Sequence, residues 1–186
     1  MVTPSSNDVC GGAQVLTSST SCNAVSATVD GYTASGISQA SCDGFSGPAL
    51  KDVWFQFQAV ETSHDIEVYG SSDFDAVVAL YSSCAAGSEI ACADGGGLGA
   101  TETINATGLT VGNDYFIRIY DYGSIDPATP GFDICVTHTV ATPPLSVTIS
   151  SSSDASCVGW NDGAATAAAS GGVPPYNYSW SNGANL

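Results

Sequence analysis

Apolar and polar residues alternate with a period of two along much of this chain, and that pattern restricts the folds open to it. In residues 52–59, every second side chain from Val53 onward is apolar. Successive side chains of a strand point to opposite faces, so such a segment buries one face and exposes the other. Residues 114–122 and 132–136 repeat the pattern. Residues 74–81, apart from Asp75, are instead apolar on both faces, as in a central strand covered on both sides.

Turn signals such as Asp30-Gly31, Gly112-Asn113 and Pro130-Gly131 separate these segments. With the shorter candidates, roughly eight or nine strands follow one another at intervals of about 8–12 residues, which predicts an all-β, antiparallel β-sandwich. The shorter candidates are residues 13–17, 26–32, 65–69, 89–93 and 101–107.

The pattern changes at Pro143-Pro144, which indicates a short, stiff linker over residues 141–145. We therefore expect a sandwich in residues 1–140 and a separate β module in residues 146–186. Strands are expected at residues 145–149, 162–170 and 176–180. Three strands leave open sheet edges, so we expect this module to be incomplete and cut off partway.

Charge excludes several classes of partner. The chain has 18 acidic residues against two basic ones, Lys51 and Arg118, and a formal net charge of −16. Nucleic-acid binding depends on basic side chains that neutralise phosphates, and an anionic membrane surface would repel this chain. No apolar run is long enough for membrane insertion. Hydrophobic residues make up 44% of the chain, which is enough for a folded core.

The seven cysteines indicate an oxidising, extracellular location. No C-x-x-C pair is present, so structural zinc is not expected. We predict three disulfides, with Cys84 and Cys92 paired across a short hairpin. The other four cysteines allow three connectivities, and Cys157 is left over, with its partner expected further downstream. Those four are Cys10, Cys22, Cys42 and Cys135. The start of the chain has no signal-peptide pattern, so we expect a leader to have been removed or to lie upstream.

Catalytic chemistry is not expected. The chain has no G-x-S-x-G motif, and its two imidazoles are His64 and His138. We interpret His64 as a solvated turn residue and His138 as the end of the last strand. No base is paired with a nucleophile in the sequence, so no catalytic residue is assigned.

Calcium is the one cofactor that the sequence suggests. Hard cations take several oxygen ligands, and strands that begin near residue 74 and end near residue 93 bring Asp73 or Asp75 close to Asp94. The alternative is that these acids cap turns and keep the surface soluble. Further candidate donors are Asp8, Asp52, Asp121 and Asp126.

Most aromatic side chains on the predicted strands, including Trp54, Tyr69 and Tyr120, are expected to fill the core. Tyr122 leaves its strand next to Gly123 and is the candidate for an exposed surface on which a sugar ring or a peptide stacks.

Several short stretches of the first 140 residues occur in a distinctive order: Asn7-Asp8-Val9-Cys10, residues 51–57, residues 72–84, residues 91–95, residues 108–118 and residues 131–136. In these stretches, residues 7–137 resemble the bacterial pre-peptidase C-terminal (PPC-like) domain found in large proteins secreted by gliding, type IX-secreting bacteria. The resemblance implies a jelly-roll-like sandwich without catalysis. Members of the wider family accompany hydrolases, and some bind calcium, matrix or polymeric substrates.

Residues 156–164 and 171–183 are similar to the first part of an SprB-type repeat, which occurs in multiples in gliding-motility surface adhesins. This sequence has Trp160 where a small or polar residue is usual, and it lacks the closing cysteine of the repeat. The resemblance implies further repeats in the same polypeptide.

Together these features predict a non-catalytic extracellular module at the bacterial cell surface. It would act in adhesion, by binding a glycan or a protein surface, and in presenting neighbouring domains. Two alternatives stay open: an accessory domain of a secreted hydrolase such as a peptidase, and a purely structural spacer.

Overall fold

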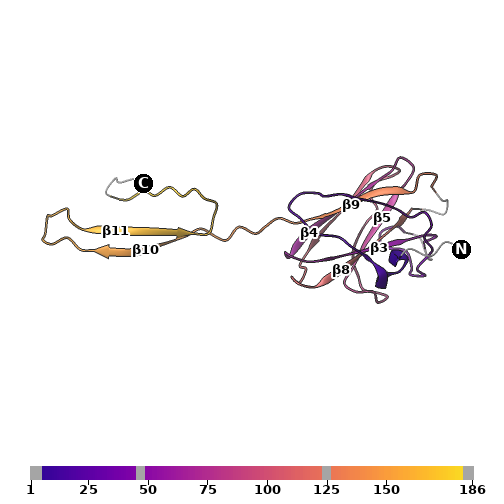
Figure 1. Ribbon diagram of the computed structural model, residues 1–186, viewed down its shortest axis with the longest axis horizontal. Helices are drawn as coiled ribbons and strands as arrows, with labels where there is room; N and C mark the ends of the chain where they lie inside the picture. The colour runs from indigo at the N-terminus through magenta and orange to yellow at the C-terminus, as the bar shows by residue number, and fades with distance from the viewer. Residues whose placement is uncertain (1–5, 45–48, 123–126, 182–186) are drawn as a thin grey trace. The chain divides into compact units, whose positions relative to one another are not determined.

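The chain divides into two compact units, Met1–Val140 and Ala141–Leu186. The computed structural model describes residues 6–44, 49–122 and 127–181, so the candidate oxygen donor Asp126 lies outside it. The first unit is a β-sandwich and the second contains a two-stranded hairpin (Figure 1). Within the described ranges, no helix has the length and apolar character needed to pass through a bilayer.

In the described part of the first unit, nine strands form two sheets. One sheet has the order β1-β3-β8-β5-β6 and the other β2-β9-β4-β7. Two short 3₁₀ turns, η1 (Ser6–Asp8) and η2 (Cys10–Gly12), precede the strands. The strands are β1 (Gln14–Val15), β2 (Val25–Thr28), β3 (Val53–Gln58), β4 (Ser63–Gly70), β5 (Ala76–Tyr81), β6 (Glu89–Ala93), β7 (Thr101–Thr107), β8 (Asp114–Asp121) and β9 (Gly131–Thr137).

The strand pairs are nested in the order of a jelly roll. β2 pairs with β9, β3 with β8, β4 with β7 and β5 with β6, all antiparallel. The short β1 is the exception, because it runs parallel to β3, with Gln14 opposite Phe55. The predicted all-β, antiparallel, jelly-roll-like sandwich is therefore confirmed.

The main core lies between the two sheets and follows the alternation in the sequence. In β7, buried residues alternate strictly with exposed ones. Aromatic rings pack in the centre of this core. The ring of Phe132 stacks on that of Phe74 with a centroid distance of 5.5 Å, and it packs edge-to-face with Phe55 at a centroid distance of 6.0 Å. Such ring pairs add to the stabilisation that comes from burying apolar area.

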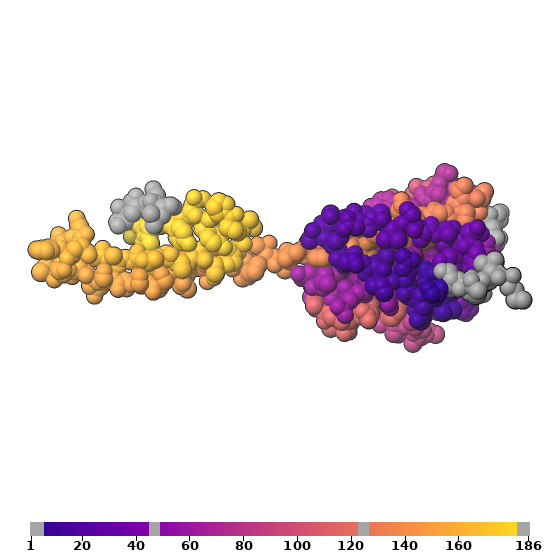
Figure 2. Space-filling view, in the orientation of Figure 1, coloured from indigo at the N-terminus to yellow at the C-terminus, as the bar shows by residue number. Residues whose placement is uncertain are grey.

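A second core covers the outer face of the five-stranded sheet. Every residue of β5 is buried, as predicted for a central strand. Val77 and Tyr81 point outward and pack beneath Cys10, Ala40 and Ala49 of the N-terminal segment. Figure 2 shows the indigo N-terminal residues forming a continuous face of this unit. Among the described residues, the outer face of the four-stranded sheet is more open: the outward side chains of β7 are exposed, and the Cys22–Cys135 disulfide covers part of β9.

Hydrogen bonds fix the N-terminal segment to the sheet. The hydroxyl of Tyr120 on β8 donates to the carboxylate of Asp43 and accepts the backbone N–H of Ala40 at 2.7 Å. The carboxylate of Asp8 accepts the backbone N–H and the hydroxyl of Thr33 at 2.6 and 2.7 Å. This covering segment is therefore an integral part of the folded unit.

Three disulfides join distant parts of the first unit: Cys10–Cys84, Cys22–Cys135 and Cys42–Cys92. The predicted Cys84–Cys92 pair is wrong. In the β5–β6 hairpin, Cys92 lies opposite Ala79, whereas Cys84 lies in the connecting loop beyond Tyr81. Each therefore meets a cysteine of the N-terminal segment that covers this sheet.

The second unit is built on β10 (Ser146–Ser153) and β11 (Ala164–Ser170), which pair antiparallel with Val147 opposite Ala169. The strand expected at residues 176–180 does not form in the described part of this unit. Consecutive prolines precede it, and the Tyr178 hydroxyl accepts the backbone N–H of Ala169 at 3.0 Å. Cys157 is exposed and lies outside the three disulfides.

Candidate functional site

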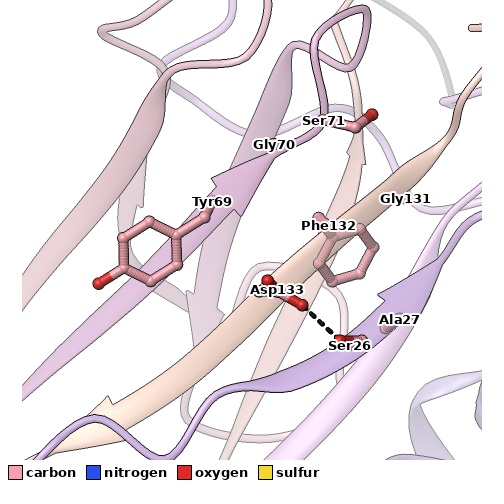
Figure 3. Close-up of a pocket in the computed structure, with 8 residues that line it drawn as sticks. All are labelled: Ser26, Ala27, Tyr69, Gly70, Ser71, Gly131, Phe132 and Asp133. Atoms are coloured by element: carbon pink, nitrogen blue, oxygen red, sulfur yellow. Dashed lines mark hydrogen bonds between the residues drawn. The ribbon is translucent and has the colours of Figure 1, made fainter.

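The outer face of the four-stranded sheet carries a pocket. It is a shallow hollow of about 360 Å³, where the end of β4 meets the start of β9 and the edge strand β2 (Figure 3). The residues that line it are Ser26, Ala27, Tyr69, Gly70, Ser71, Gly131, Phe132 and Asp133. This mixture of one accessible aromatic ring and a few polar groups is typical of small-molecule sites.

Three polar side chains form a row across the strands beside the pocket. Asp133 on β9 lies directly opposite Ser26 on β2 and Tyr69 on β4. The hydroxyl of Ser26 donates to Asp133 Oδ1 at 2.6 Å. In Figure 3, Asp133 lies between Ser26 on one side and Tyr69 on the other. The row therefore offers a carboxylate, a hydroxyl and an aromatic ring on one face.

The ring of Tyr69 is held by its neighbour on the same strand. Its hydroxyl donates to Glu67 Oε2 at 2.7 Å. This hydrogen bond, with smaller contributions from burial and from the charge of Glu67, raises the pKa of Tyr69 above its usual value. Because the hydroxyl is tethered, the ring position is set before any ligand arrives, which reduces the entropy lost on binding.

Gly70 shapes the rim of the pocket. A Cβ added at Gly70 would lie 2.5 Å from the carbonyl oxygen of Phe74, closer than any side chain can approach. The backbone N–H of Phe74 donates to the carbonyl of Ser71 at 3.0 Å, which closes the turn after β4. Glycine at position 70 therefore allows the tight turn that brings Ser71 to the pocket.

The sequence missed this pocket because Tyr69 was grouped with core-filling aromatics, and for Tyr69 that expectation is wrong. His64, Ile66 and Val68 are buried, while Tyr69 is only half-buried. The sequence did contain the information, because Tyr69 is at an odd-numbered position of this strand, whereas the buried residues are at the even-numbered ones and point to the opposite face.

Tyr122, the ligand-binding residue expected from the sequence, lies elsewhere. It is 39% exposed at the end of β8, and its backbone N–H donates to the carbonyl of Asp75 at 2.7 Å. It is not among the residues that line the pocket. Its contribution to binding stays a prediction.

The candidate metal ligands are split between two places. The carboxylate of Asp73 accepts the backbone N–H of Thr129 at 2.8 Å and also the Thr129 hydroxyl. The charge of Glu102 instead acts on both Asp75 and Asp94, and the charge of Asp75 acts on Asp94. Glu102 is buried, and its carboxylate accepts the backbone N–H groups of Gly95 and Gly96 at 2.9 and 2.5 Å.

Burial and mutual repulsion among these three acids disfavour the charged forms of Asp75 and Asp94. Burial, and then the charge of Glu102, raises the pKa of Asp75. The pKa of Asp94 is raised by burial, then by Asp75, Glu102 and Asp43. Asp75 Oδ1 is buried and has no hydrogen-bond donor. The burial of Glu102 could have been predicted from the sequence, because it shares one side of residues 101–107 with the apolar residues Ile104 and Ala106.

The side chains around Asp75 supply at most some of the ligands of a cation site. Among the described residues, three potential ligand atoms come within 4.8 Å of one another at Cys22, Glu67 and Cys135, and not at the acids around Asp75. Cys22 and Cys135 are joined in a disulfide, so they offer no thiolate to a metal. Around Asp75, two carboxylates could share an ion only with backbone carbonyls or water as the remaining ligands.

The other candidate donors serve the fold. Asp52 is fully buried beside Arg118. Asp8 binds Thr33, and the carboxylate of Asp121 accepts the backbone N–H of Asp75 at 2.9 Å.

His64 is buried, so the prediction of a solvated turn residue is wrong. It is 2% exposed and lies in β4, on the side that faces the core. Its ring lies 5.1 Å from that of Phe57 and 5.6 Å from that of His138. Burial, and then the charge of His138, lowers the pKa of His64, against smaller opposite effects of Glu61 and Asp65.

His138 lies close to a hydroxyl. Its Nδ1 is 2.8 Å from Ser18 Oγ. A serine hydrolase also needs a third group that orients the imidazole and donors that stabilise the oxyanion. In the part of the chain that the structure describes, no carboxylate is hydrogen-bonded to the His138 ring. The contact instead joins the segment before β2 to the end of β9.

Two family profiles match the sequence. Residues 6–134 match the T9SS-associated family described as galactose binding domain-like, and residues 149–185 match the SprB repeat. The resemblance to a domain of type IX-secreted proteins followed by an SprB-type repeat is confirmed. Both families are binding or repeat modules, and they indicate a secreted or cell-surface protein.

Two solved structures are similar to the chain. The pre-peptidase C-terminal domain of collagenase from Bacillus anthracis has 11% identity and a TM-score of 0.43, and the match covers 67% of this chain and 95% of that one. The carbohydrate-binding module CBM36, in complex with calcium and xylotriose, has 19% identity and a TM-score of 0.31, with 60% and 96% covered. A search of curated proteins found no match.

Proposed function

The chain belongs to the T9SS-associated galactose binding domain-like family, and from that membership we propose that its first unit is a non-catalytic module that binds a glycan. The binding site is the pocket beside Tyr69 on the outer face of the four-stranded sheet. The SprB match of the second unit supports display of this module at the bacterial cell surface, where glycan binding would serve adhesion during gliding.

One observation carries the proposal: a tethered aromatic ring lies directly opposite a carboxylate, at the rim of a pocket. The Tyr69 ring offers an apolar surface to one face of a sugar, while Asp133, Ser26 and Ser71 offer hydrogen-bond partners to its hydroxyl groups. A few convergent polar groups next to an aromatic surface provide orientation and specificity in small-ligand sites. The other outer face of the sandwich is covered by the N-terminal segment and offers no such surface.

A glycan array probed with the intact chain tests this proposal. We expect binding that is lost in Tyr69→Ala and unchanged in Tyr122→Ala, which removes an exposed tyrosine away from the pocket. Isothermal titration with the best oligosaccharide then gives the affinity of each variant. If no glycan of any class binds, the proposal fails; if Tyr122→Ala alone abolishes binding, the site lies at the end of β8 instead.

We also propose a divalent cation, with calcium as the first candidate, between Asp75 and Asp94. The unpartnered Asp75 Oδ1 and the raised pKa of both carboxyl groups favour a positive ligand there. Asp73 belongs to the originally expected set, but Thr129 already occupies its carboxylate. Such an ion would supply positive charge to the cluster and fix the loop after β6 next to β5.

A further inference from the structure

The outward face of the four-stranded sheet is acidic. Asp65 and Glu67 on β4 and Asp133 on β9 have the same strand parity as Tyr69 and point away from the core. The outward neighbours on β7 are neutral: Thr101, Thr103 and Asn105. Neither basic residue of the chain lies on these strands. Arg118 is fully buried on the other sheet, and Lys51 precedes β3.

Asp133 lines the pocket, whereas Glu67 lies beside it, opposite Cys135 and next to the Cys22–Cys135 disulfide. Both carboxylates keep part of their binding capacity. In the described residues, the Ser26 hydroxyl donates to Asp133 Oδ1, which leaves Oδ2 for another donor. Glu67 accepts the Tyr69 hydroxyl through Oε2, which leaves Oε1 for another donor. Asp65 is already bound to Asn105 Nδ2 at 2.8 Å.

Tyr69 lies between these two carboxylates. Asp133 is directly opposite it, and Glu67 precedes it by two residues on the same face. Side chains directly opposite on paired strands have Cβ atoms about 5 Å apart, and diagonal neighbours about 7–8 Å. A ligand that rests on the Tyr69 ring therefore has a carboxylate within reach on two sides.

These charges select the ligand. A uronate or sulfate group in this pocket would face two carboxylates with no cation to pair with, and a neutral sugar would use the hydroxyl partners alone. An ammonium group would pair with Asp133 and Glu67 and would also be attracted to the face of the Tyr69 ring. We infer that the pocket binds a glycan with a protonated primary amine, such as a de-N-acetylated hexosamine oligomer. This inference rests on the proposed glycan-binding function.

Four oligosaccharides of equal length test this inference: a glucosamine tetramer, its N-acetylated form, an uncharged glucose tetramer and a uronic acid tetramer. Titration calorimetry with the intact chain, below the pH at which the amines lose their protons, should show tightest binding for the amine form. Asp133→Asn and Glu67→Gln should each weaken binding of the amine form about tenfold, and should weaken it more than they weaken binding of the N-acetylated form. Asp114→Asn, which removes an exposed charge from the other sheet, serves as the matched control.

The outcomes separate the two proposals. Equal or tighter binding of the N-acetylated, neutral or uronic tetramer overturns the inference about charge and leaves glycan binding intact. Amine binding that is insensitive to both Asp133→Asn and Glu67→Gln overturns the site. Binding of none of the four, together with a blank array, overturns both the inference and the proposed function.

Discussion

The guanidinium of Arg118 lies 2.6 Å from the carboxylate of Asp52, and neither side chain is exposed. Ser35 donates to the same carboxylate through its backbone N–H and its hydroxyl. Two further guanidinium N–H groups donate to the carbonyls of Ile37 and Ser38 at 3.1 and 2.7 Å. The ion pair thus joins β8 and the start of β3 to the segment that covers their sheet.

Replacing Arg118 with methionine should strongly destabilise the first unit. It leaves the Asp52 charge buried without a counter-ion and two backbone carbonyls without donors. Breaking a buried pair on one side costs about 3–5 kcal/mol of unfolding free energy. Urea unfolding measures this loss. The double variant Arg118→Met with Asp52→Leu should be less destabilised than the single one, and equal losses would show that the pair is not coupled as described.

Peptide mapping without reduction should recover Cys10–Cys84, Cys22–Cys135 and Cys42–Cys92 as linked fragments. The Cys22–Cys135 bond closes the longest loop, with a sequence separation of 113. Chain-entropy estimates assign a loop of that length about 4–5 kcal/mol, so Cys22→Ser with Cys135→Ser should lower the free energy of unfolding by roughly that amount. Recovery of a fragment that links Cys84 to Cys92 would contradict the pairing.

Millimolar calcium should raise the melting temperature of the first unit if an ion binds between Asp75 and Asp94, because a ligand that binds only the folded state stabilises it. Asp75→Asn should remove this shift. Asp73→Asn is the matched control and should keep it, since Thr129 engages the Asp73 carboxylate. An unchanged melting temperature in the native chain would count against the ion.

Stability should fall as the pH drops below about 6.5, in part through His64. Burial lowers the folded pKa of His64 below the usual histidine value of about 6.5, so between these two pKa values the unfolded chain binds more protons. The stabilisation is complete above 6.5, is lost as the pH falls towards the folded pKa, and changes by at most about 1.4 kcal/mol per pH unit for one proton.

Asp75 and Asp94 act with the opposite sign, because their pKa values are raised and the folded state holds their protons longer. The His64 contribution is therefore measured as the difference between the native chain and His64→Leu, by urea unfolding between pH 5 and 7. The difference should depend on pH below 6.5 and be constant above it. The same slope in both proteins would exclude His64 as its source.

Alternation predicted most strands of the first unit, because it reflects burial along a single segment. Residues 101–107 and 114–121 became strands at nearly the expected positions. Pairing between segments was not accessible in the same way. Cys84 and Cys92 are close in sequence, but the register of their hairpin separates them, and their partners come from a segment with little regular secondary structure.

The candidate site was only partly predictable for a related reason. The spacing of Glu67 and Tyr69 along one strand puts them on one face, but nothing local shows that Asp133, far along the chain, lies opposite Tyr69. Asp75 and Asp94 were expected together because both lie near the ends of neighbouring strands. Glu102 was overlooked because a buried acid contradicts the usual alternation, and its role in holding the Gly95–Gly96 backbone depends on a loop conformation.

The segment before β3 also determines how the protein can be shortened. A chain that started at Val53 would lose Cys10, Cys22 and Cys42, and with them one half of every cross-link. It would also expose Trp54, Val77 and Tyr81 to water as one hydrophobic patch. Deletion of the residues before β3 would therefore produce a protein that aggregates.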